Sequence, residues 1–156
     1  DGAELSGVLF VSGWKCPPVG KITVVFDDLL EGDELPTAAV DLASEFVRDH
    51  AADLGMEAGR FSDHEAARAE GLPGQILPGV MSMGLLARML LENAPSARVT
   101  RLGTTFRGLV LASQKIQLHA MITEKDEPAR TCEIDLWLET EAGQRNVVGT
   151  ATLSFQ

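Results

Sequence analysis

The 156-residue chain has the length of one domain, and its 45% hydrophobic content is typical of a globular protein rather than a disordered one. With 23 acidic against 13 basic residues the net charge is −10. This charge argues against a general binder of nucleic acid or of anionic membranes, because phosphates require clustered lysine and arginine side chains. One small basic site for an anionic ligand remains compatible with it.

The two cysteines, Cys16 and Cys132, are far apart and form no Cys-x-x-Cys pair, so their spacing indicates no zinc site. A disulfide between them stays open, although two cysteines in a chain of this size more often mark reduced thiols. The short apolar run at residues 8–11 has no basic segment before it, so we expect no secretory signal and a cytoplasmic protein.

Glycines and prolines interrupt any regular period at the start of the chain. We expect an extended arm over residues 1–21, with Trp14 packed in a surface groove, followed by a single domain over residues 22–156. Residues 22–26 predict a short strand. The acidic residues 27–36 lack the spacing of a calcium-binding loop, so they predict a solvated turn.

Two helices are expected before the middle of the chain. Residues 37–42 predict another short strand, and residues 44–54 predict a helix with Ser44 at its N-cap. Asp63 is expected to cap a second helix over residues 64–70.

The stretch over residues 78–93 predicts a helix that is apolar almost all round. Between Gly79 and Leu91 its only charged residue is Arg88. A surface helix would show a polar face at a period of about 3.6 residues, and a membrane span would need about 20 apolar residues. We therefore expect a buried helix that other elements enclose.

After this helix the hydrophobic period changes to two, which predicts strands. Four are expected, at residues 99–110 with a kink near Gly108, 115–123, 133–140 and 146–155. Successive hairpins give an antiparallel sheet. The predicted fold class is α+β, with the sheet wrapped around the central helix.

The stretch Asp63–Gly84 resembles the MaoC-like dehydratases, which include the (R)-specific enoyl-CoA hydratases. The resemblance extends forward to residues 26–34 and back to residues 104–110 and 149–153, and it covers about residues 22–155. It implies the hot-dog fold, in which an antiparallel sheet wraps one apolar helix. It also implies that subunits pair through their sheets, as a homodimer or a heteromer.

The chemistry that this resemblance implies is the addition of water to an enoyl thioester, or the reverse dehydration. In the family an Asp and a His of one motif act together on the water. A glycine N–H at the start of the central helix polarises the thioester carbonyl, as the positive end of a helix can. Gly79 of Pro78-Gly79 matches that glycine. The implied ligand is an acyl-CoA or an acyl-carrier thioester, and no cofactor is expected.

The acid and base of the family motif have no counterpart in an alignment without gaps. Gly55 matches its first glycine, but Met56 stands at the Asp position, Ala58 at the Asn position and Phe61 at the His position. The resemblance therefore implies an acyl site whose contacts come from Gly79, Val80, Ser82, Met56 and Phe61.

Two functions remain open. In the first, the chain is a hydratase or dehydratase with a replaced acid and base, for which Asp63 and His64 are the candidates and Asp53 and Glu57 the reserves. The structural alternative is that Asp63 caps a helix and that His64 is exposed. An active enzyme should place Asp, Glu or His within about 3 Å, or one water, of a position near the Gly79 amide.

In the second, the chain is a catalytically silent acyl-binding subunit that partners an active chain. A thioesterase is a weaker third alternative, because hot-dog folds also host that reaction. The three histidines have no metal-ligand spacing, so no metal is expected. Arg101 and Arg107 are either ordinary surface residues or contacts for an anionic group such as a CoA phosphate.

Overall fold

The computed structural model describes residues 23–156, so the arm expected over residues 1–21, with Trp14 and Cys16, lies outside the described residues. Five strands form one antiparallel sheet in the order β1–β3–β4–β5–β2. They are β1 (Ala38–Asp41), β2 (Ala97–Phe106), β3 (Lys115–Asp126), β4 (Thr131–Thr140) and β5 (Arg145–Phe155). The helical elements are η1 (Phe26–Asp28), α1 (Ser44–Asp53), α2 (Gly59–Ser62), α3 (His64–Ala69) and α4 (Gly79–Asn93).

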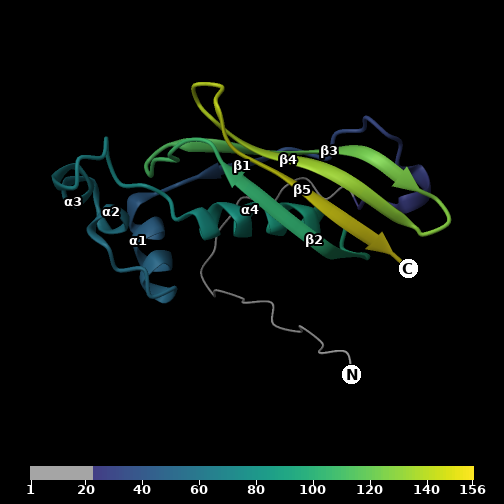
Figure 1. The fold of residues 1–156 in the computed structure, drawn as a ribbon, viewed down its shortest axis with the longest axis horizontal. Helices are drawn as coiled ribbons and strands as arrows, with labels where there is room; N and C mark the ends of the chain where they lie inside the picture. Colours follow the sequence, from purple (N-terminus) through teal and green to yellow (C-terminus); the bar gives the residue numbers. More distant parts are fainter. Residues whose placement is uncertain (1–22) are drawn as a thin grey trace.

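The apolar helix α4 lies along one face of the sheet, as the sequence predicts (Figure 1). It contacts β2, β3 and β4. Alternate residues of the strands point toward it and are buried in the core: Ile116, Leu118, Ala120, Ile122, Ile134, Leu136 and Leu138. The three short helices α1, α2 and α3 gather at one end of the sheet, beside the start of α4 (Figure 1). The expected α+β architecture is therefore confirmed.

The strand expected at residues 22–26 is wrong over its described part. The Val24 N–H donates to the Asn93 carbonyl at 2.9 Å, so it caps the last turn of α4 and is not paired within the sheet. Phe26 then starts η1 and packs against Phe155, with ring centroids 5.3 Å apart. A segment whose residues favour a strand therefore lies at the end of a helix instead.

Two expected helix caps have different outcomes. Ala43 is the N-cap of α1, so the capping role expected for Ser44 is wrong, and Ser44 is the first residue of the helix. Asp63 caps α3 as predicted, because its Oδ1 accepts from the Ala66 N–H at 2.8 Å. The four-residue helix α2 is too short to be seen as a period in the sequence.

The strand β2 ends at Phe106, whereas the sequence predicts that it continues to residue 110. The N–H groups of Arg107 and Gly108 both donate to the Asn146 carbonyl, at 2.8 and 3.1 Å, which turns the chain away from β5. Residues 110–112 then run beside the approach to α4. The early end of β2 therefore positions the start of the central helix.

Candidate functional site

The start of α4 presents the N–H groups of Gly79 and Val80, which have no hydrogen-bond acceptor in the part of the chain that the structure describes. The next two N–H groups, those of Met81 and Ser82, both donate to the Pro78 carbonyl, at 3.0 and 3.3 Å. Unpaired amides at a helix N-terminus carry the positive end of its dipole. The Gly79 and Val80 amides can therefore polarise a carbonyl oxygen that comes to them.

The ring of Phe106 lies against this helix start. A Cβ atom added to Gly79 would lie 2.8 Å from Phe106 Cζ, closer than real Cβ contacts come, so any other residue at this position would displace the ring. The ring is nevertheless 51% exposed, and Val80 is 48% exposed. The start of α4 is thus open to solvent with an aromatic ring on one side.

The approach to α4 is fixed by pairing with residues 110–112. The Leu77 N–H donates to the Val110 carbonyl at 2.7 Å, and the Ala112 N–H donates to the Gln75 carbonyl at 2.9 Å. This short ladder holds the segment immediately before Gly79 against the chain that follows β2. The amides of the helix start are therefore held in position by the backbone of two separate segments.

Gln75 joins this approach to the short helices, and sequence reasoning missed it. Its side chain is fully buried. Its Oε1 accepts from Ser44 Oγ at 2.5 Å, and its Nε2 donates to the carbonyls of Phe61 and Ser44 at 2.7 and 3.1 Å. A signal was present, because Gln75 is the only polar side chain in the apolar run over residues 72–80.

The positions that align with the missing acid and base lie at the turn between α1 and α2 and on α2. Met56 follows the end of α1 and is half-buried, with its N–H donating to the Ala51 carbonyl at 2.8 Å. Ala58 is exposed, and Phe61 on α2 is half-buried above Gln75. None of these three side chains carries a group that can transfer a proton.

Asp63 and His64, the candidate replacements, each have structural partners. Asp63 is exposed and its Oδ1 caps α3. His64 Nδ1 accepts from the Gln75 N–H at 3.2 Å, which assigns the ring proton to Nε2, and Nε2 lies 3.0 Å from Ser113 Oγ. One ring nitrogen of His64 therefore holds the approach to α4, and the other contacts the segment that follows β2. No hydrogen bond joins the two side chains within the described residues.

The other titratable candidates also face solvent or pair elsewhere. Asp53 and Glu57 are exposed, and Arg60 forms an ion pair with Glu70 at 2.9 Å. Within residues 23–156 no group of three His, Cys, Asp or Glu side chains is close enough to hold a metal ion. Burial raises the pKa of the Cys132 thiol in the core, which keeps it protonated.

Solved structures of the same shape identify the architecture. No family model matches the chain, and no curated protein matches its sequence. The R-hydratase PhaJ1 of Pseudomonas aeruginosa matches with a TM-score of 0.79 at 17% identity, over 85% of this chain and 86% of its own. A MaoC-like dehydratase matches with a TM-score of 0.78 at 25% identity, over 86% of this chain and 43% of its own.

A third match is to the ChsH1–ChsH2 complex of Mycobacterium tuberculosis, with a TM-score of 0.73 at 18% identity over 81% of this chain and 98% of the matched one. This is the hot-dog fold. It is the fold of the MaoC-like hydratases and dehydratases, so the resemblance inferred from the sequence is confirmed at this level. None of the helices described in this hot-dog domain is long and apolar enough to cross a membrane.

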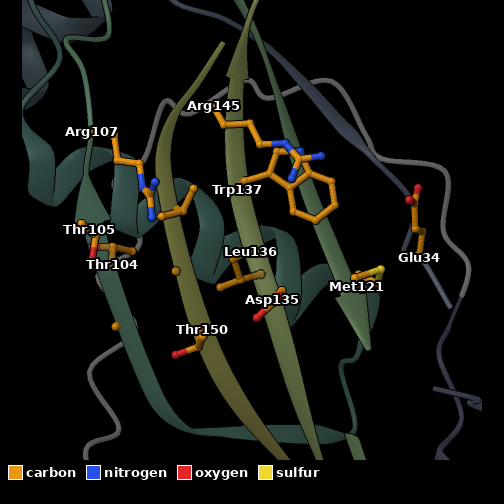
Figure 2. A pocket seen from close by; sticks show the side chains of 13 residues that line it. Glu34, Thr104, Thr105, Arg107, Met121, Asp135, Leu136, Trp137, Arg145 and Thr150 are labelled. Atoms are coloured by element: carbon orange, nitrogen blue, oxygen red, sulfur yellow. The ribbon is translucent and has the colours of Figure 1, made fainter. Parts of the chain in front are cut away.

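The hot-dog sheet also carries a hollow of about 800 Å³ on the face opposite α4 (Figure 2). It is lined by side chains of β2, β3, β4 and β5, among them Asp135, Trp137 and Arg145, and by Arg107 just after β2. The Arg145 guanidinium lies 4.3 Å from the Trp137 ring centroid, so the indole face is covered by the protein itself. The hollow does not include Gly79, and it is separate from the start of α4.

Of the two arginines considered for an anionic group, Arg107 lines this hollow and Arg101 does not. The rings of His119 and Trp137 stack nearly parallel beside the hollow, with their centroids 4.9 Å apart. Trp137 lies on the face of β4 that carries Asp135, and its neighbours leave it only 8% exposed.

Proposed function

We propose that this chain is a hot-dog subunit that binds an acyl thioester, on coenzyme A or on a carrier protein, and serves a hydratase or dehydratase whose acid and base lie on another chain. One observation carries the proposal: the Gly79 and Val80 amides are unpaired at the start of α4, while Met56, Ala58 and Phe61 occupy the positions of the missing motif. The chain has the amides that could polarise a carbonyl, and it lacks the motif residues that would transfer a proton.

The engagement of the candidate replacements supports this division of labour. His64 uses both ring nitrogens on protein partners, and Asp63 uses an oxygen on the cap of α3. A general base needs a free lone pair within reach of the water that it deprotonates. Among the structural matches, the ChsH1–ChsH2 structure is a complex of two proteins, which supports a heteromer as one form of the assembly.

A hydratase that uses its own Asp63 and His64 is the second candidate. The observation in its favour is the bond between His64 and the Gln75 N–H, which holds the imidazole beside the segment that leads directly to Gly79. In this candidate the approach of substrate releases the Nε2–H of His64 from Ser113, so His64 is the proton donor and Asp63 is the base. Both candidate functions involve subunits that pair through their sheets.

The decisive experiment measures binding and turnover on the same protein. Binding of butanoyl-CoA, which cannot be hydrated, is measured by calorimetry, and trans-2-enoyl-CoA substrates of short and long chain length are assayed for hydration and for thiol release. We expect binding without turnover. Val80→Pro removes one polarising N–H at a position in the first helical turn, where proline is tolerated, and should weaken binding. Val80→Ala keeps the N–H and is the matched control.

Each other outcome identifies an alternative. Turnover that disappears in Asp63→Asn or in His64→Ala, with Glu65→Gln as the exposed control beside them, would establish the second candidate. Because His64 holds the approach to α4, a folded state of His64→Ala must be shown by circular dichroism. Turnover that both variants retain would indicate that Asp53 or Glu57 is the acid or base. Release of thiol would indicate a thioesterase, and absence of any binding would refute the proposal.

A further inference from the structure

The ring of Phe106 lies against the first residue of α4. The Cα–Cβ bonds of a helix project from its side with a tilt toward its N-terminus, so an atom near the missing Cβ of Gly79 lies beside the first turn, toward its N-terminal end. The three atoms nearest to that position are the ring carbons Cζ, Cε1 and Cε2 of Phe106, at 2.8, 3.0 and 3.1 Å. The far edge of the ring therefore lies beside the amides that the proposed function uses.

The ring is held there by the strand that carries it. Phe106 is the last residue of β2 and pairs with Val147 of β5. The following residues turn away, since the Arg107 and Gly108 amides both donate to the Asn146 carbonyl. The backbone on both sides of Phe106 is therefore fixed, and the ring can leave the helix start only by rotating about its own side-chain bonds.

We propose that Phe106 closes the space beside the Gly79 and Val80 amides and so restricts the site to acyl groups that are unbranched next to the thioester carbonyl. This inference rests on the proposed function. A carbonyl oxygen bonded to the two amides brings its own α-carbon against the helix start, where the phenyl edge lies. A methyl branch on that carbon meets the ring, whereas a methylene extends past it.

Two ligands of equal composition test the inference on the whole chain. Butanoyl-CoA and 2-methylpropanoyl-CoA differ only in the position of one methyl group, and neither can be hydrated. We expect the wild type to bind the unbranched ligand about tenfold more tightly, the discrimination typical of one methyl group in an apolar pocket. Phe106→Ala should bind both ligands equally. Leu91→Ala, which truncates an exposed apolar residue in the last turns of α4, should keep the preference.

A second measurement tests the contact without any ligand. Gly79→Ala alone places a methyl group within 3.1 Å of three ring atoms, so it should lower the thermal midpoint. In a Phe106→Ala background the same change meets no ring and should cost much less. Equal losses in the two backgrounds would contradict the contact on which the inference stands.

The outcomes separate the inference from the proposed function. A wild type that binds neither ligand overturns the proposed function, and the inference with it. A wild type that binds both equally, or a Phe106→Ala protein that keeps the preference, overturns the inference and leaves the proposed function standing.

Discussion

The buried amide of Gln75 connects α1, α2 and the approach to α4 through three side-chain hydrogen bonds, to Ser44 and to the Phe61 carbonyl. No water replaces these bonds when the side chain changes, because Gln75 is fully buried. Its partners would then be left without a donor or an acceptor, which costs about 1–3 kcal/mol for each buried group.

At the residue scale we therefore predict that Gln75→Leu lowers the free energy of unfolding by about 2–4 kcal/mol. Equilibrium unfolding in urea measures this loss. Gln117→Leu is the matched control, because Gln117 is exposed on β3, and it should change the stability by less than about 0.5 kcal/mol. Similar losses in the two variants would show that the Gln75 bonds contribute little.

Local chemistry was predictable for single residues and distant chemistry was not. Asp63 reaches an amide three residues away, and the sequence predicted its cap correctly. His64 bonds to Ser113, which is 49 residues away, and no local pattern points to that partner. Separation in sequence also hid Phe106, whose ring reaches Gly79 from the end of a strand.

At the element scale α4 contains one glycine that its packing does not require. Gly84 is exposed, and a Cβ atom added there would meet nothing within 4 Å. Glycine inside a helix costs about 0.5–1 kcal/mol relative to alanine. We predict that Gly84→Ala raises the stability by about this amount, measured as a higher thermal midpoint.

Gly149→Ala is the contrasting variant within β5. A Cβ atom there would collide with the Gly103 carbonyl of β2, so this change should lower the thermal midpoint. A lower midpoint for Gly84→Ala would instead indicate that a partner packs on this turn of α4.

Periodicity predicted the elements whose whole length is regular. The apolar run of α4 and the alternation of β3, β4 and β5 gave these elements, because burial on one side or on all sides leaves a repeating pattern. The strand expected at residues 22–26 was wrong, since the Val24 amide bonds to the last turn of α4 and propensity alone cannot show that. The position at which β2 ends depended on Asn146, a residue of another strand.

At the scale of the whole molecule, β2 forms one edge of the described sheet. It is ten residues long and pairs on one side only, with β5. A long unpaired edge offers a row of amides and carbonyls to another strand. We predict that the purified chain sediments with a mass above the 16.7 kDa of one copy, as a dimer or a larger oligomer. If it needs a companion chain, the mixture of the two chains should sediment as a heteromer. Sedimentation as a monomer at every concentration, alone and with such a chain, would contradict this.

The wrapped helix was predictable at this scale, and the hollow on the other face of the sheet was not. Its lining comes from four strands and from Glu34, and only the pairing and curvature of the sheet bring these residues together. A net charge of −10 is compatible with one small basic region, but the hollow is not one, because Glu34 and Asp135 line it together with Arg107 and Arg145.

The order of the strands has a consequence for synthesis. The sheet inserts β5 between β4 and β2, so β2 has no neighbour until β5 exists. The ribosome makes β5 about fifty residues after the end of α4, a delay of several seconds at about 5–20 residues per second. During that time the cover of α4 is incomplete, because β2, one of the strands that it contacts, has no partner strand. A nascent chain of this protein should therefore bind chaperones until translation has passed β5.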